Sequence, residues 1–155
     1  MNAIIRKVRE PFGILGNMSQ HPVEFEGLKY HTTEALFQAL RFPVGSEIRE
    51  LIRQEKNPMK AKMLAKSHTE LMIVEQLSQQ DLDNMRFVLR TKLDAHESVR
   101  KVLASTGQDL IVEDCSNRPH GSGLFWGAQL VEGSWNGLNW LGKLWMELRQ
   151  SAFEG

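Results

Sequence analysis

The feature that constrains this chain most is the stretch of residues 29–42, where polar side chains interrupt an otherwise apolar helical pattern. A helix beginning at Thr33 would be apolar around most of its circumference, and such a helix is usually buried. Glu34, Gln38 and Arg41 fall at i, i+4 and i+7 and would form one narrow polar stripe. From this stretch alone, the favoured interpretation is a solvated edge, with Glu34 stabilised in the first turn by the helix dipole.

Length and composition predict one globular domain over residues 1–155, because 41% of the residues are hydrophobic and can build a core. Nineteen basic residues balance nineteen acidic ones, so no global field would hold a polyanion, although a compact site for one nucleotide stays open. The single Cys115 excludes an internal disulfide, and no apolar run resembles a secretory signal or a membrane span. We therefore expect a cytoplasmic protein that does not enter membranes.

The remaining periodicities predict a mainly α fold, within the α+β class. Residues 1–20 lack periodicity, residues 22–30 alternate as a small β-hairpin, and residues 109–113 form one further short, buried strand. Helices are expected after the capping residues Ser46 and Asn57, the first of them with an apolar face of Ile48, Leu51 and Ile52. Further helices are expected after Ser78, over residues 97–104 and from about residue 137.

Lys92 is the second unusual position. On the helix that begins after Ser78, it projects between Met85 and Val88, inside the apolar arc. Helical projection alone favours a lysine whose stem packs and whose ammonium snorkels to solvent. The functional interpretation is an ammonium in a cleft, acting as an anion contact or as a nucleophile with a depressed pKa.

Two glycine-rich or polar stretches could carry function. Residues 114–123 form a ten-residue polar loop, long for a compact domain. Residues 133–142 mix glycine and asparagine at a helix start, where free backbone N–H groups can hold an anion. No phosphate-binding or dinucleotide fingerprint occurs, and the five histidines are scattered without metal-ligand spacing, so we expect no metal.

Short motifs follow one another in a distinctive order from Phe12 to Arg149: Gly16-Asn17-Met18, Pro22-Val23, Gly27, Thr33-Glu34, Phe37-Gln38-Ala39, Phe42, Asn57-Pro58-Met59, Ala61, Met85, Lys92-Leu93, Leu103, Thr106-Gly107, Ile111-Val112-Glu113, Trp126-Gly127, Gly137, Asn139, Leu141-Gly142, Met146 and Arg149. Together they resemble the YbiA-like or NADAR family of N-glycosidases. Three departures stand out: Ala35 replaces the family's His, Arg41 replaces a Lys, and a Trp upstream of the Met85 helix is absent. An acidic residue usual near the Trp-Gly pair is also missing, with Gly123 near its place.

The resemblance implies an N-glycosyl hydrolase with a YbiA-like fold that cleaves the C–N bond between ribose C1 and an amine of a base. The family's substrates are ribosylamino-pyrimidines of early riboflavin biosynthesis and ADP-ribose attached to guanine. The expected partner is therefore a nucleotide-like small molecule or ADP-ribosylated guanine, free or in a nucleic acid. No cofactor and no obligate protein partner is implied.

The resemblance also assigns roles to residues. Glu34 would stabilise positive charge on the ribose or activate water, and Lys92 would attack ribose C1 through a Schiff base or contact the sugar or phosphate. Glu113 or Asp114 would serve as a second acid/base, although a carboxylate at a strand end is as often a loop cap. Substrate-binding roles fall to Phe12, Asn17, Gln38, Arg118, Trp126, Gly137 and Asn139, with core packing as the alternative for Trp126.

Two other classes of function are compatible with the sequence. A non-catalytic module that binds ADP-ribose or a related nucleotide would explain the missing family residues. A purely structural module would place Glu34 and Lys92 far apart in the fold. The enzyme is favoured because both residues occupy positions where packing alone would not require them.

Overall fold

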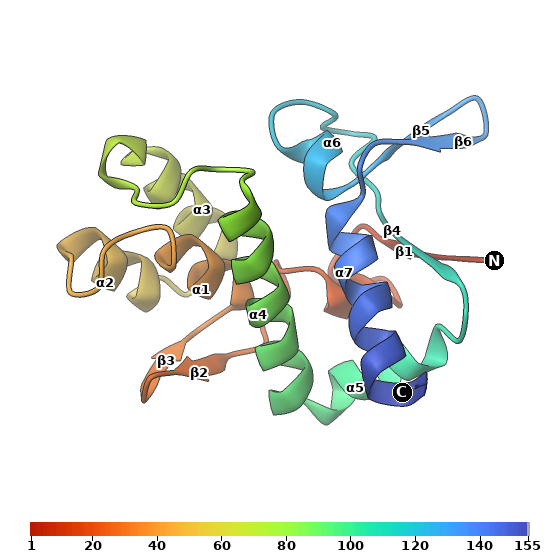
Figure 1. The fold of residues 1–155 in the computed structure, drawn as a ribbon, viewed down its shortest axis with the longest axis horizontal. Coiled ribbons are helices and arrows are strands. Elements are labelled where there is room, and N and C mark those ends of the chain that lie inside the picture. The colour runs from red at the N-terminus through yellow and green to blue at the C-terminus, as the bar shows by residue number, and fades with distance from the viewer. Residues whose placement is uncertain (155) are drawn as a thin grey trace. The chain divides into compact units, whose positions relative to one another are not determined.

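The computed structural model describes residues 1–154 and confirms a mainly helical α+β fold (Figure 1). The chain forms two compact units, which we name for their place in the sequence. The middle unit is Asn17–His96, and the terminal unit combines residues 1–16 with the chain from Glu97 onward. Because the terminal unit takes residues from both ends of the chain, sequence order alone does not reveal this division. One domain over residues 1–155 stays a prediction.

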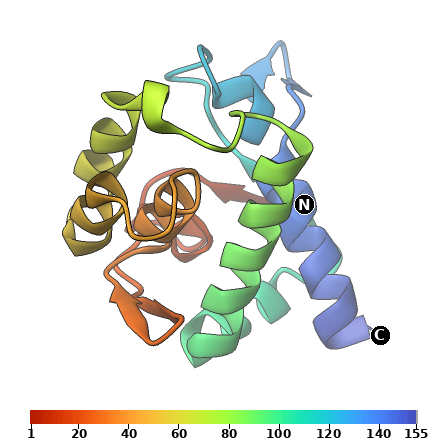
Figure 2. The same cartoon turned by 60° about the vertical axis from the view of Figure 1, so that its left-hand side comes forward.

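The middle unit is built around helix α1 (Thr33–Ala39), every residue of which is buried. This helix packs against α2 (Glu47–Gln54), α3 (Pro58–Lys66) and α4 (Gln79–Ala95), as Figures 1 and 2 show. A short helix can be covered by three others in this way only if its polar residues find partners inside the protein. Whether the polar stripe of α1 is buried or exposed therefore depends on these three helices.

The predicted hairpin is confirmed as β2 (Val23–Phe25) and β3 (Leu28–Tyr30), which pair antiparallel. Its two-residue turn places Glu26 at φ 51° and Gly27 at φ 76°. Positive φ at both central positions gives a turn whose twist matches that of the strands. Strand β3 packs against α1 and α2, so the hairpin belongs to the core of the middle unit.

Side-chain caps start the helices of the middle unit where the sequence predicted. The Ser46, Asn57 and Ser78 side chains accept hydrogen bonds from backbone N–H groups in the first turns of α2, α3 and α4. The predicted apolar face of α2 is wrong in one residue, because Leu51 is 48% exposed while Ile48 and Ile52 are buried. The buried face of α2 thus consists of two residues one helical turn apart, which is sufficient for a helix of this length to pack against α1.

The terminal unit is organised around two parallel strands, β1 (Asn2–Ile5) and β4 (Leu110–Glu113). Strand β4 confirms the predicted strand, whereas β1 was missed because its partner lies beyond the entire middle unit in the sequence. Helix α7 (Trp140–Arg149) packs on β4, and α5 (Glu97–Ser105) packs on α7. A Cβ at Gly142 would lie 2.1 Å from the Ile111 carbonyl oxygen, so only glycine allows this approach of α7 to the strand.

The C-terminal half of the terminal unit adds a short helix, α6 (Gly123–Trp126), and a second hairpin, β5 (Gln129–Val131) with β6 (Ser134–Asn136). The sequence did not predict this hairpin because Leu130 and Val131 are both exposed and leave no alternating pattern. Among residues 1–154, no helix is both long and apolar enough to cross a membrane. The remaining helical turns are Gly13–Leu15, Thr69–Leu71 and the π-helical turn Gln150–Glu154.

Candidate active site

The polar stripe of α1 is buried, so the interpretation of a solvated edge is wrong. Glu34 is 6% exposed, Gln38 4% and Arg41 5%. The error has a physical cause, since helical periodicity shows which residues share a face but not which faces other helices cover. Here α2, α3 and α4 cover α1, and the stripe lies inside the middle unit.

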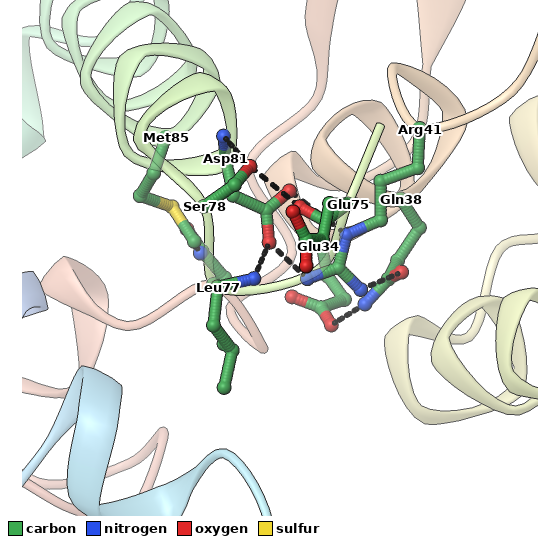
Figure 3. A network of polar contacts seen from close by, with 9 residues as sticks. Glu34, Gln38, Arg41, Glu75, Leu77, Ser78, Asp81 and Met85 are labelled. Carbon is green, nitrogen blue, oxygen red and sulfur yellow. Dashed lines mark hydrogen bonds and ion pairs between the residues drawn. The ribbon is translucent and has the colours of Figure 1, made fainter. Parts of the chain in front are cut away.

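The three side chains of the stripe form a directed chain of hydrogen bonds (Figure 3). The Arg41 Nη1 donates to Gln38 Oε1 over 3.1 Å, and Gln38 Nε2 donates to Glu34 Oε1 over 3.0 Å. Because a guanidinium only donates, the amide oxygen of Gln38 must face Arg41. The amide nitrogen of Gln38 is therefore fixed toward the Glu34 carboxyl group.

Arg41 is itself held by Asp81, a residue that the sequence analysis did not select. The Arg41 Nε donates to Asp81 Oδ1 over 3.0 Å and the Arg41 Nη2 to Asp81 Oδ2 over 2.5 Å. Asp81 is 0% exposed and also accepts from the Leu77 backbone N–H over 2.8 Å. A buried pair of this two-pronged geometry fixes both partners. Its signal in the sequence was the position of Asp81 three residues after the cap Ser78.

The environment of Glu34 raises the pKa of its carboxyl group. Desolvation by burial is the largest cause, because the charged form loses contact with water. The hydrogen bond from Gln38 and the charges of Lys62 and Arg41 act in the opposite direction and offset part of the rise. Glu34 is thus a carboxyl group that takes up a proton more readily than an exposed glutamate.

Asn17, a predicted substrate-binding residue, lies next to the start of α1. The Thr33 hydroxyl donates to Asn17 Oδ1 over 2.9 Å, and Asn17 Nδ2 donates to the Met85 sulfur over 3.2 Å. A thioether is a weak acceptor, so a better acceptor could displace it at low cost. Asn17 therefore connects the residue before Glu34 with α4.

Lys92 is 0% exposed, which makes the predicted snorkelling wrong. Its ammonium donates to the Ser19 hydroxyl over 2.7 Å. Burial lowers the pKa of Lys92 to about 7, because an ammonium without water is destabilised relative to the neutral amine. Since Ser19 and Asn17 are two residues apart, one short segment touches both Lys92 and the start of α1.

In the terminal unit, Asn139 has both ends of its amide group engaged by strand β4. The Asn139 Nδ2 donates to the Ile111 carbonyl oxygen over 2.8 Å, and Asn139 Oδ1 accepts from the Glu113 N–H over 3.0 Å. Its backbone is left-handed, with φ 52°, a conformation that asparagine tolerates. The Asn139 amide group thus pairs with the backbone of β4 in the way that a peptide group of a neighbouring strand would. Its role with ribose stays a prediction.

The other predicted residues of the terminal unit lie at the end of β4, in the segments between β4 and α7, and just before the helical turn Gly13–Leu15. Asp114 accepts from the Ser116 N–H over 2.9 Å, which is the geometry of a loop cap. At the helix start, the Leu138 N–H donates to the Leu124 carbonyl over 2.8 Å and the Asn139 N–H to the Gly127 carbonyl over 3.0 Å, so two candidate anion-binding groups are already used. Phe12, Glu113 and Trp126 are partly buried, while Arg118 and Gly137 are exposed.

The geometry of the middle unit suits charge stabilisation and amine chemistry. A buried carboxyl group with a raised pKa and a buried amine with a lowered pKa are the combination expected of acid/base or nucleophilic sites. Within the described residues 1–154, no three His, Cys, Asp or Glu side chains gather in a way that could hold a metal ion.

Comparison with known proteins identifies one family, two relatives and one solved structure that resemble this chain. The NADAR domain family pattern matches residues 5–152. The chain is 32% identical to the N-glycosidase Npun_R5314 of Nostoc punctiforme, over 97% of this chain and 92% of that protein. It is 30% identical to the N-glycosidase YbiA of Escherichia coli, over 91% and 82% respectively. The NMR structure of E. coli YbiA superposes with a TM-score of 0.78 at 28% identity, covering 96% of this chain and 84% of that one.

Proposed function

Because the chain belongs to the NADAR domain family, we propose that it is an N-glycosidase that hydrolyses the bond between ribose C1 and an amine of a base. Its relatives from N. punctiforme and E. coli are both named N-glycosidases, and the chain spans most of each. The proposed substrates carry the ribose as a ribose phosphate or as ADP-ribose, with a pyrimidine or guanine as the leaving base. The base acts as a leaving group, so no redox step is needed.

The observation that carries this proposal is the burial of Glu34 in the apolar surroundings of α1. Breaking an N-glycosidic bond develops positive charge on the ribose, and a carboxylate beside that charge stabilises the transition state. The stabilisation is larger in a site without water, because the effective dielectric constant is lower there. A raised pKa also makes Glu34 a stronger base toward an attacking water.

Lys92 is proposed as the nucleophile. The neutral amine of Lys92 attacks ribose C1, the bond from C1 to the base nitrogen breaks, and the base leaves with a proton. The bond from C1 to the ring oxygen then breaks as the remaining amine proton passes to that oxygen, which gives a Schiff base between C1 and Lys92. Water hydrolyses the Schiff base to the free sugar and the amine. The lowered pKa of Lys92, about 7, supports this role because a neutral amine is available near neutral pH. The alternative role is a contact to the sugar or its phosphate.

The remaining roles are assigned by chemistry and family resemblance. Asn17 and Gln38 are proposed to contact the ribose, and Phe12 and Trp126 to flank the base. Asn139, the backbone at Gly137 and the exposed Arg118 are proposed to contact phosphate or ribose oxygens. Glu113 is proposed as the second acid/base, in preference to Asp114, because Asp114 already caps a loop.

The test of the function is release of free base, followed by chromatography, from a ribosylamino-pyrimidine phosphate and from ADP-ribosylated guanosine. We expect turnover of one of the two, reduced about 100-fold or more by Glu34→Gln. Glu47→Gln is the matched control, since Glu47 lies in the first turn of α2 but is exposed. Binding of ADP-ribose by folded protein without release of base from either compound would instead support a non-catalytic binding module.

A separate experiment distinguishes the two roles of Lys92. Borohydride added during turnover should attach the sugar covalently to Lys92, as peptide mass spectrometry would show. Lys92→Arg should abolish base release, because a guanidinium keeps the charge but is a poor nucleophile. Retained activity in Lys92→Arg would exclude the Schiff base and favour the sugar or phosphate contact.

A further inference from the structure

A second chain of hydrogen bonds leads away from Lys92 through residues that the proposed function does not use. The Lys92 ammonium donates to Ser19 Oγ over 2.7 Å, and Ser19 Oγ lies 2.9 Å from His21 Nδ1. Ser19 is 1% exposed, whereas His21 is partly exposed. The chain therefore runs from a fully buried amine to a side chain that water can reach.

His21 is placed in turn by His96, the residue that follows α4. Their rings meet edge to face, with centroids 5.1 Å apart and an interplanar angle of 89°. The His96 Nε2 lies 2.6 Å from the carbonyl oxygen of Pro22, which only accepts, so the ring proton of His96 must be on Nε2. The His21 ring therefore has two contacts that orient it. One is the edge-to-face contact with His96, and the other joins its Nδ1 to Ser19 Oγ.

The direction of the second hydrogen bond depends on the tautomer of His21. Ser19 Oγ accepts from Lys92, and a relay requires the tautomer in which His21 Nδ1 accepts the hydroxyl proton of Ser19. That arrangement requires a neutral His21 with its proton on Nε2. Burial, followed by the charges of Lys92 and His96, lowers the pKa of His21 and so favours the neutral ring.

We propose that Ser19 and His21 form a proton relay that carries the ammonium proton of Lys92 to solvent. This inference rests on the proposed role of Lys92 as a nucleophile, since only the neutral amine can attack a sugar carbon. A lysine with 0% exposure has no direct contact with bulk water through which to lose that proton. Ser19 and His21 are positioning residues in this account, because they act on substrate through Lys92.

The relay moves one proton at each step. Lys92 gives a proton to Ser19 Oγ as the Ser19 hydroxyl proton passes to His21 Nδ1, which leaves a neutral amine and an imidazolium. His21 then loses its Nε2 proton to water. When the Schiff base is hydrolysed, the transfers reverse: His21 regains a proton at Nε2 and returns its Nδ1 proton through Ser19 to Lys92. No proton is gained or lost over a full cycle.

The most direct test measures how fast the Nζ protons of Lys92 exchange with water, by NMR on full-length protein labelled with ¹⁵N-lysine. At about pH 6 the ammonium form is populated. His21→Asn should slow this exchange about tenfold or more, because an amide oxygen still accepts from Ser19 but cannot pass a proton onward. Ser19→Ala should slow it similarly. His68→Asn is the matched control and should leave the exchange unchanged.

Chemical rescue separates a relay from a merely structural role. In His21→Ala, added imidazole should restore the exchange of Lys92 toward the wild-type rate, which repacking of the site would not achieve. Exchange that stays at the wild-type rate in His21→Asn would overturn the relay. If Ser19→Ala does not fold, the His21 variants are sufficient to test the relay. These variants should fold, because the His21 ring is partly exposed and its loss leaves no large cavity.

Single-turnover base release links the relay to catalysis. His21→Asn should lower the rate by about the same factor as the exchange, with the pH at half-maximal rate unchanged. Slowed exchange together with no base release by wild-type protein would refute the proposed function while keeping the relay. Normal base release with unchanged exchange in His21→Asn would refute the relay while keeping the function.

Discussion

Two regions of this protein both gather polar side chains, but they hold them in different ways. In the region of α1 and α4, side chains bond to side chains: Arg41 to Gln38, and Gln38 to Glu34. In the region of β4 and α7, side chains bond to backbone groups, as Asn139 and Asp114 do. A side chain that satisfies the backbone is needed for the fold, whereas a buried charge held by other side chains is costly to the fold.

Because its buried charged groups destabilise the fold, the region of α1 and α4 is the better candidate for the catalytic site. Burial raises the pKa of Glu34 and lowers that of Lys92, so both charged forms are destabilised in the folded protein. Proteins keep such groups at functional sites and offset them elsewhere in the fold. Measurements of stability and activity in variants of each region test whether the two differ in this way.

The largest effect on stability is expected from Arg41→Leu. It leaves the carboxylate of Asp81 buried without its partner, which should lower the free energy of unfolding by roughly 3–5 kcal/mol. Urea denaturation would measure the loss. The double variant Arg41→Leu with Asp81→Leu should recover part of it, because no unpaired charge remains. A loss below about 1 kcal/mol in the single variant would show that the pair does not hold this region together.

Asn139→Ala should have the next largest effect. It removes both hydrogen bonds to β4 and leaves the Ile111 carbonyl and the Glu113 N–H without those partners, for a loss of roughly 2–4 kcal/mol. Asn136→Ala is the exposed control and should change stability by less than about 0.5 kcal/mol. An unchanged melting temperature together with a raised KM would instead show that Asn139 contacts the substrate rather than stabilising the fold.

Lys92→Met should act in the opposite direction and stabilise the protein, by about 1–3 kcal/mol at neutral or lower pH. The pKa of Lys92 falls from 10.5 to about 7 on folding, so the unfolded chain binds more protons between these values. Wild-type stability therefore gains from this group as pH rises from 7 to 10.5, and the advantage of Met should shrink over that range. Thermal melts across this pH range would measure it. A constant difference would contradict the burial of an ammonium.

Local features of the sequence were sufficient to predict most helix starts and the first hairpin. Ser46, Asn57 and Ser78 cap helices through their own side chains, and Glu26-Gly27 turns the hairpin without help from distant residues. Strand β1 could not be predicted this way, because a four-residue strand gains its stability from β4 and that partner is distant in the sequence.

The sequence was sufficient to select candidate residues but not to predict the environment in which they lie. Glu34 and Lys92 were selected because they interrupt apolar patterns, yet a pattern cannot show whether the interrupted face is covered. Asp81 had a capping signal that explained it without a partner, so its contact with Arg41 was missed. Ser19 and His21 lie in a segment without regular structure, where no spacing marks a relationship to Lys92.

The central claim is that the carboxyl group buried in α1, rather than the one at the end of β4, stabilises the reacting sugar. Single-turnover base release by Glu34→Gln and Glu113→Gln, in the same assay and with folding verified by circular dichroism, tests it most directly. The account predicts a loss of about 100-fold or more for Glu34→Gln and less than about tenfold for Glu113→Gln. A larger loss for Glu113→Gln than for Glu34→Gln would contradict it.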